Sequence, residues 1–299
     1  MRTQETPAVH TAGLGKRYGS LWALQDCSVT VPAGRVTALI GPNGAGKTTL
    51  LKILAGLSRP SAGEVTVLGR PPGQDAGFLD SIGYLAQDIP LYRRLSAGDH
   101  IRIFARLNRH WDAGAAADRL AALNIPVTRA VGSLSGGQRA QVGLSLALAK
   151  QPRLLLLDEP VAALDPLARH EFLSSLAEAA AEGGPAVILS SHLLHDLEQV
   201  CSHLILLSAS RTQLCDAIDN VIATHRVLIG PRGKPPAGVT VIKATNAPRQ
   251  SRLLARLDGP VLDPSWDVHE VALEDIVLAY MGEAASAGNS NLTAIGEAS

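Results

Sequence analysis

The stretch that decides the fold of this chain is Gly41-Pro42-Asn43-Gly44-Ala45-Gly46-Lys47-Thr48, which fits the phosphate-binding pattern G-x-x-x-x-G-K-[ST]. An apolar run over 36–40 is typical of a buried strand entering this loop, and residues 49–54 are typical of a helix leaving it. A strand, a glycine loop and a helix together place backbone N–H groups and a helix N-terminus against an anion. The sequence therefore predicts a nucleoside triphosphate site.

Two side chains of this loop have specific expected roles. Lys47 is expected to reach the β- and γ-phosphates, and the Thr48 hydroxyl is expected to ligate Mg²⁺. The expected nucleotide-binding residues of the loop are Gly41, Pro42, Asn43, Gly44, Ala45, Gly46, Lys47, Thr48 and Thr49. The alternative is a glycine-rich turn with a chance lysine, which the flanking strand and helix disfavour.

Composition narrows the class of partner. The 299 residues include 27 Lys+Arg and 27 Asp+Glu, so the balanced charge gives no electrostatic case for nucleic acid. Hydrophobic residues make up 46% of the chain and aromatic residues 3%, which predicts a core of Leu, Val, Ile and Ala. The three cysteines, Cys27, Cys201 and Cys215, lack the spacing of a zinc site and are expected to be buried cytosolic thiols.

The apolar runs are too short for a membrane span. One of the longest, Leu154 to Leu157, is strand-length, whereas a span needs about 20 residues. The first five residues, Met1 to Glu5, lack the apolar segment of a signal peptide. We therefore expect a cytoplasmic chain whose membrane role, if it has one, comes through a partner.

The periodicity along the chain predicts an α/β fold. Apolar strands alternate with helices up to about residue 208, which indicates a mixed, largely parallel sheet with a helical subdomain at about 90–150. Short β-like runs and an amphipathic helix over 209–282 predict a small C-terminal α+β accessory domain. The small polar residues of 283–299 predict a disordered tail, and residues 1–12 are expected to be a loose lead-in. Ser96 is expected to cap the helix that begins near it, and a further helix is expected over Leu194–Cys201.

Two carboxylates follow a second buried strand. Leu154 to Leu157 are followed directly by Asp158, Glu159 and Pro160. A carboxylate at such a strand end, beside the phosphate loop, can hold Mg²⁺ directly or through water, which we assign to Asp158. Glu159 can then orient the attacking water, and general-base catalysis is typically worth about 10²–10⁴-fold. The alternative reading is a pair of strand-end carboxylates that cap a helix.

The order of motifs resembles the ATP-binding cassette (ABC) family. Leu134-Ser135-Gly136-Gly137-Gln138 lies between the phosphate loop and the Asp-Glu-Pro segment, and His192 follows at the end of another apolar strand. The resemblance covers about residues 1–210. It implies a P-loop NTPase fold of ABC type and an ATPase with ATP and Mg²⁺ as its cofactors.

The resemblance also implies roles for isolated residues. Gln87 matches a glutamine that touches Mg²⁺ and water, and His192 matches the histidine that contacts the γ-phosphate. Tyr18 matches the aromatic that stacks on adenine, with Trp22 as a less favoured substitute. The implied catalytic residues are Glu159, His192, Lys47 and Gln87, and the implied metal ligands are Thr48, Gln87 and Asp158.

The second glycine loop implies a dimer. Ser135, Gly136, Gly137 and Gln138 form an anion site at a helix start, and in the family this loop closes on the ATP of an opposing cassette. Asp165 matches the loop that links the two composite sites, and Arg139 matches a common basic residue after the signature. Ala163 stands where the family usually has Ser or Gly. The sequence therefore departs from the family pattern in the loop expected to couple the two composite sites. A head-to-tail homodimer or heterodimer of cassettes is expected.

The context of the motifs favours a transporter subunit. One cassette, no coiled-coil insertion and no span imply a stand-alone subunit on the cytoplasmic face of the membrane, bound there through a separate permease. Residues 272–278 and 91–96 resemble bacterial drug- and antibiotic-export cassettes, which favours export of a small molecule over import. A non-transport regulator or ribosome-associated factor stays open, as does an importer cassette, whereas the intact motifs disfavour an inactive one. Substrate contacts would lie in the permease, so the sequence leaves the transported molecule open.

Overall fold

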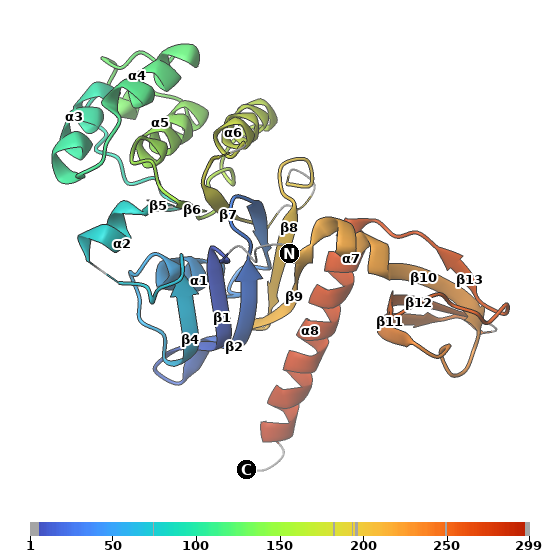
Figure 1. Cartoon of the computed structure of the whole chain (residues 1–299). Coiled ribbons are helices and arrows are strands. Elements are labelled where there is room, and N and C mark those ends of the chain that lie inside the picture. The colour runs from blue at the N-terminus through green and yellow to red at the C-terminus, as the bar shows by residue number, and fades with distance from the viewer. Residues whose placement is uncertain are drawn as a thin grey trace.

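A six-stranded sheet with the order β5-β6-β7-β3-β8-β9 forms the centre of the computed structural model (Figure 1). The model describes residues 6–73, 75–181, 183–192, 194, 197–248 and 250–296. The strands are β3 (Val36–Ile40), β5 (Ile82–Leu85), β6 (Leu154–Leu157), β7 (Ala186–Ser191), β8 (His203–Ser208) and β9 (Arg211–Ala217). All neighbours pair in parallel except β8 and β9, which confirms the expected mixed, largely parallel α/β sheet.

The central strands are apolar throughout because both faces of the sheet are covered. Leu155 and Leu157 of β6 point into one core cluster, together with Phe172 and Leu176 of α6 (Pro166–Ala179). The alternate residues of β6 point into a second core cluster on the other face, which includes Leu50 of α1 (Lys47–Leu54). The predicted aliphatic core is therefore divided by the sheet into two layers.

A smaller antiparallel sheet covers the second of these layers. It has the order β2-β1-β4 and consists of β1 (Val9–Tyr18), β2 (Leu21–Val31) and β4 (Ala62–Val67). The short helix α2 (Ala76–Asp80) follows and is capped by Asp75, whose side chain accepts from the Phe78 N–H at 2.9 Å. β1 begins at Val9, inside the segment 1–12 that the sequence predicts to be a loose lead-in, because its alternating apolar residues pair with both β2 and β4.

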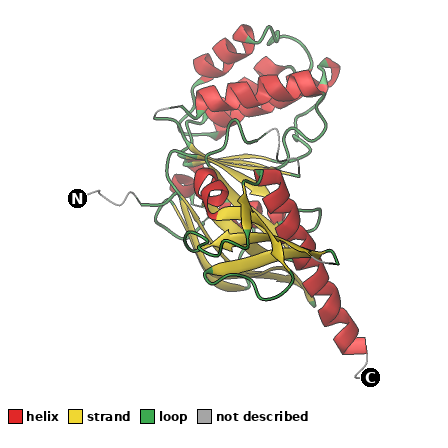
Figure 2. Cartoon of the chain, turned by 90° about the vertical axis from the view of Figure 1, so that its right-hand side faces the viewer, coloured by secondary structure: helices red, strands yellow, loops and turns green. Residues whose placement is uncertain are grey.

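Helices form a separate layer at one end of the sheet (Figure 2). α3 (Ala97–Leu107), α4 (Ala113–Ala122), the 3₁₀ turn Val131–Ser133 and α5 (Gly136–Ala149) share a core cluster of their own. Ser96 caps α3 as expected, in a reciprocal capping box with Asp99. The helix expected over Leu194–Cys201 differs: the described residues 197–200 form hydrogen-bonded turns, and residues 193, 195 and 196 lie outside the described residues.

The C-terminal part is an antiparallel sheet flanked by helices. α7 (Ile218–Thr224) leads into the strands β10 (His225–Pro231), β11 (Val239–Asn246), β12 (Gln250–Leu257) and β13 (Asp267–His269), in the order β11-β12-β10-β13. α8 (Leu273–Gly296) contributes Ile276 and Val277 to the larger core cluster. The expected boundary at residue 208 stays a prediction, and β9 extends the main sheet past it through Ala217.

α8 continues into the segment 283–299, for which the sequence predicts disorder. Its backbone is helical through Gly296, and residues 297–299 lie outside the described residues. Alanine has the highest helix propensity, and the alanines at 284, 285 and 287 favour this continuation.

A buried histidine ties α8 to the rest of the C-terminal part. The His225 ring Nδ1 lies 2.8 Å from the Val221 carbonyl oxygen, and its Nε2 lies 3.0 Å from the Tyr280 hydroxyl on α8. Burial lowers the pKa of His225, and the charge of Arg256 lowers it further, whereas the bond to Val221 opposes the shift. The folded chain therefore binds this proton less readily than the unfolded chain.

Stability should consequently fall in mild acid. As the pH drops below 6.5, the ordinary pKa of histidine, the unfolded chain takes up the proton first, so the free energy of unfolding decreases. We expect His225→Gln to flatten the fall in melting temperature between pH 7 and about pH 5.5. The exposed His269 gives the control variant His269→Gln, which should keep the wild-type slope. Equal slopes for wild type and His225→Gln would contradict this prediction.

Candidate functional site

Three neighbouring parallel strands deliver the expected site residues to one edge of the sheet. β3 ends at the phosphate loop, β6 ends just before Asp158, and β7 ends just before His192. The carboxyl ends of parallel strands share an edge, so these segments meet in a hollow of about 650 Å³. The hollow is lined by Tyr18, Ala23, Asn43, Gly44, Ala45, Gly46, Lys47, Thr48, Thr49, Gln87, Glu159, Ala162 and His192.

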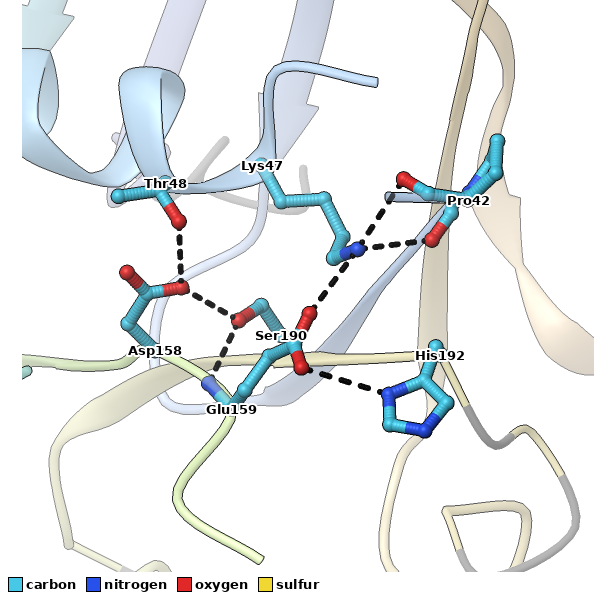
Figure 3. A network of polar contacts seen from close by, with 8 residues as sticks. Pro42, Lys47, Thr48, Asp158, Glu159, Ser190 and His192 are labelled. Carbon is cyan, nitrogen blue, oxygen red and sulfur yellow. Dashed lines mark hydrogen bonds and ion pairs between the residues drawn. The ribbon is translucent and has the colours of Figure 1, made fainter. Parts of the chain in front are cut away.

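Lys47 is held by backbone carbonyls and by one carboxylate (Figure 3). Its Nζ donates to the Gly41 carbonyl at 2.8 Å and to the Pro42 carbonyl at 3.3 Å, and it lies 3.1 Å from Glu159 Oε1. The Lys47 side chain is 5% exposed, so its charge acts in a site with little water. The ammonium group is thus fixed over the phosphate loop by the loop's own backbone.

Glycine at position 46 is required by the backbone. Gly46 precedes α1 with φ 103°, a conformation that side chains disfavour, and a Cβ there would lie 2.5 Å from the Ala23 carbonyl oxygen. α1 begins at the next residue, Lys47. The first N–H groups of α1 have no partner within the helix, which suits this end of the helix to an anion.

Asp158 and Thr48 lie in direct contact, so one ion could reach an oxygen of each residue. The Thr48 hydroxyl donates to Asp158 Oδ1 at 3.1 Å, and the Ser190 hydroxyl donates to the same oxygen at 3.0 Å. The Asp158 side chain is buried. Carboxylate and hydroxyl oxygens are the donors that Mg²⁺ prefers, so these residues fit the ion that the phosphate loop implies.

Glu159 faces the hollow from an uncommon backbone conformation. Its φ of 46° lies in the left-handed region, and its N–H donates to Ser190 Oγ at 2.8 Å. One carboxylate oxygen pairs with Lys47, and the other lies 3.3 Å from His192 Nδ1. The carboxylate therefore lies between Lys47 and His192, and a backbone hydrogen bond to Ser190 holds the residue that carries it (Figure 3).

Two further predicted site residues, Tyr18 and Gln87, line the hollow and are more exposed than Lys47 and Glu159. Tyr18 is 52% exposed at the end of β1, and Gln87 is exposed just after β5. Among the described residues that line the hollow, Trp22 does not occur; its ring packs against Gly15, where a Cβ would lie 2.8 Å from Cζ3. This geometry favours Tyr18 over Trp22 as the adenine platform, which stays a prediction.

The second glycine loop lies apart from the hollow. Of the described lining residues, none comes from 134–139. Ser135 caps α5 in a capping box with Gln138, and the glycine at position 137 lets α5 approach α6, because a Cβ there would lie 2.7 Å from Ala168 Cβ. Asp165 caps α6, accepting from the Ala168 N–H at 3.0 Å. Ser135, Gly136, Gly137, Gln138 and Asp165 are thus not brought to Lys47 of their own chain.

Sequence reasoning missed Ser190 as a member of this constellation. Its hydroxyl links Asp158 to the backbone of Glu159, and the residue is fully buried. The available signal was a pair of serines at the end of an apolar strand, immediately before His192. Two hydroxyls in a run of buried aliphatic residues need polar partners, and this run ends at the expected site.

The phosphate loop at the head of α1, with a carboxylate at the end of a nearby strand of the same sheet, defines a P-loop nucleoside triphosphatase. The family model described as ABC transporter matches residues 24–162. The Nod factor export ATP-binding protein I of Rhizobium johnstonii is 34% identical over 210 residues, which cover 68% of this chain and 67% of that protein. The chain therefore belongs to the ABC transporter family and is one of its ATP-hydrolysing cassettes.

Two further similarities agree with this assignment. An uncharacterised ABC transporter ATP-binding protein of Nostoc is 33% identical over 246 residues, covering 75% of this chain and 71% of its relative. The solved cbiO1 of Clostridium perfringens, part of the ABC transporter complex cbiONQ, superposes with a TM-score of 0.65 at 26% identity, covering 73% of this chain and 92% of that one. In the part of this chain that the structure describes, no helix has the length and apolarity needed to cross a bilayer.

Proposed function

We propose that this chain is the ATP-binding and ATP-hydrolysing subunit of an exporter, energising a separate membrane permease. The observation that carries the proposal is the hollow in which Lys47 and Thr48 of the phosphate loop meet Glu159 and His192, with Asp158 directly behind Thr48. In this proposal the chain lies on the cytoplasmic face of the membrane, where it is bound to its permease.

In this proposal each residue of the hollow has a separate task. Mg²⁺ would be held by Thr48 and Asp158, with Gln87 reaching it from the loop after β5, and would neutralise charge on the phosphates. Lys47 binds the β- and γ-phosphates from its buried position. Glu159 accepts a proton from the attacking water, and His192, within reach of the same carboxylate, stabilises the developing charge on the γ-phosphate.

The arrangement of the second glycine loop supports a dimer of cassettes. Ser135 to Gln138 open α5 at the positive end of its helix dipole, which suits an anion, yet they do not line the hollow that holds their own phosphate loop. A second cassette placed head to tail would bring this loop onto the nucleotide. Two ATP molecules would then be enclosed between two subunits, and their hydrolysis would release the closed dimer.

An apolar groove beside Gln87 supports the permease as partner. It measures about 230 Å³ and lies between the segment after β5 and the helices α3 and α5. Phe104 and Trp111 line it, with ring centroids 5.7 Å apart, and Lys150 lies at its edge. We assign this groove to a short helix of the permease. Its walls are apolar, and they adjoin Gln87, so a helix bound there would lie next to the nucleotide site.

The likeness to an export protein supports the direction of transport. The Rhizobium relative is a Nod factor export protein by name, and the alignment covers two thirds of both chains. The sequence features at 91–96 and 272–278 favour the same direction. We therefore propose export of a small molecule, whose identity would be set by the permease.

The groove gives a direct test of the partner. We expect Phe104→Ser to lower recovery of a multi-span membrane protein with the tagged chain at least tenfold, because the variant removes an apolar wall of the groove. Leu107→Ser is the matched control: Leu107 lies on the same helix, is 74% exposed and is absent from the described residues of the groove.

The measurement is affinity capture from crosslinked membranes of the source cells, with a melting curve for each variant to verify folding. Recovery of ribosomal proteins or of a regulator, with no multi-span protein, would overturn the transport proposal. Equal recovery with both variants would overturn the assignment of the groove.

A further inference from the structure

We propose that Ser190 is a positioning residue for ATP hydrolysis, with one hydroxyl that sets both the Asp158 carboxylate and the backbone of Glu159. The inference rests on the proposed roles of Asp158 and Glu159. It adds a residue to which neither the motifs nor the comparisons give a role. Ser190 lies near the end of β7 and is fully buried, so its hydroxyl has no access to water and depends on protein partners.

The Ser190 hydroxyl both accepts and donates a hydrogen bond (Figure 3). Ser190 Oγ accepts the Glu159 N–H at 2.8 Å and donates its own proton to Asp158 Oδ1 at 3.0 Å. The Glu159 N–H can only donate, so Ser190 Oγ accepts from it. The Asp158 carboxylate accepts the single hydroxyl proton of Ser190. A change at Ser190 must therefore disturb both neighbours at once.

The bond to Glu159 replaces the strand ladder at the point where β6 ends. The parallel pairing of β6 with β7 ends at Leu157 opposite Leu189, and the Asp158 N–H then donates to the Leu85 carbonyl of β5 at 2.9 Å. The next N–H, that of Glu159, goes to Ser190 on the other side. The end of β6 is thus held from both neighbouring strands, one residue after the other.

This support matters because of the backbone conformation of Glu159. A residue with a side chain rarely adopts a φ of 46°, and such a conformation persists where its surroundings hold it. The Ser190 hydroxyl supplies one such constraint through the Glu159 N–H. Without it, we expect the Glu159 carboxylate to lose its fixed position between Lys47 and His192.

The bond to Asp158 matters for the metal site. Oδ1 of Asp158 accepts from both the Ser190 and the Thr48 hydroxyls, which fixes the plane of a buried carboxylate. Loss of one hydroxyl frees that plane to turn. Ser190 therefore links Asp158, which is proposed to hold Mg²⁺, to Glu159, which is proposed to accept the proton. This link runs through protein groups alone.

The test is steady-state kinetics of the full-length chain with Ser190→Ala. We expect kcat for ATP hydrolysis to fall at least tenfold with KM for ATP within twofold, and the Mg²⁺ concentration for half-maximal rate to rise severalfold. Ser190→Thr, which keeps the hydroxyl, should recover most of kcat. The matched control is Ser145→Ala, because the buried Ser145 hydroxyl donates only to its own helix, to the Gln141 carbonyl at 2.8 Å.

A second readout does not depend on turnover. In a Glu159→Gln background, Mg²⁺-dependent binding of a fluorescent ATP analogue should need severalfold more Mg²⁺ when Ser190→Ala is added, and binding without Mg²⁺ should stay unchanged. If Ser190→Ala melts early, Ser190→Cys provides the comparison, since its thiol still fills the position and weakens both hydrogen bonds.

Wild-type kcat and Mg²⁺ dependence in Ser190→Ala, or in Ser190→Cys where the alanine variant does not fold, would overturn the inference alone. Normal hydrolysis in Glu159→Gln would instead overturn the role of Glu159 within the proposed function, on which the inference rests. The two failures are distinguishable because each is read from a different single variant.

Discussion

Replacing Lys47 by alanine should abolish measurable ATP hydrolysis, with a loss of at least about a hundredfold. The Lys47 ammonium is the cation that the phosphate loop itself brings into the hollow, and its side chain is 5% exposed. Two loop carbonyls hold it in place, so it needs little reorganisation to meet the charge that develops on the β- and γ-phosphates. The rate is measured as phosphate release at saturating ATP and Mg²⁺.

The control for this variant lies on the same helix. Lys52 is exposed in the last turn of α1 and is absent from the described residues that line the hollow, so Lys52→Ala should hydrolyse ATP at the wild-type rate. Lys47→Ala also leaves the largely buried Glu159 carboxylate without its cation, so a melting curve must accompany the rate. A folded Lys47→Ala protein with full hydrolysis would contradict the proposed site.

The sequence predicts most of the cassette because its strands are short, apolar and bounded by clear turn residues. β6, for example, is four consecutive leucines followed by Asp158, and every one of those leucines is buried. The capping residues Ser96 and Ser135 likewise mark the helices that follow them. Local chemistry and burial agree at these positions, so the pattern alone places the elements.

Two segments have a backbone that differs from the one their sequence pattern suggests. Periodicity over Leu194–Cys201 indicates a helix, but the described residues there form turns whose Leu197 packs into the core. The alanine-rich residues after 282 have a composition typical of a tail, yet their helix propensity continues α8. The turns at 197–200 depend on how Leu197 packs into the core, which the spacing of apolar residues does not encode.

The site also contains residues that the sequence predicts and a residue that it does not predict. The phosphate loop and the Asp158–Glu159 pair are predictable, since contiguous residues carry their chemistry. Ser190 is not predictable in this way, because its contribution depends on the register of β7 against β6 and on the left-handed backbone of Glu159. Register and strain are properties of the folded sheet, so a residue that acts through them leaves only a weak trace in the sequence.

Glu159→Gln should slow ATP hydrolysis by about 10²–10⁴-fold while it stabilises an ATP-bound dimer. The amide cannot accept the proton of the attacking water, so the chemical step is lost. The amide is also neutral, which releases Lys47 from the 3.1 Å ion pair and leaves its charge for the phosphates. Nucleotide affinity should therefore be kept or increased, and light scattering with ATP and Mg²⁺ should report twice the mass of the 31.2 kDa chain.

The exposed Glu171 of α6 gives the matched control, Glu171→Gln, which makes the same chemical change away from the hollow and should keep wild-type hydrolysis. Slow hydrolysis without a dimer would separate the two parts of the argument: Glu159 would keep its role with the water, and closure by Ser135 to Gln138 of a second chain would be contradicted. Full hydrolysis in Glu159→Gln would exclude Glu159 as the general base. Because Lys47 and His192 both contact this carboxylate, their positions would then have to be explained by nucleotide binding alone.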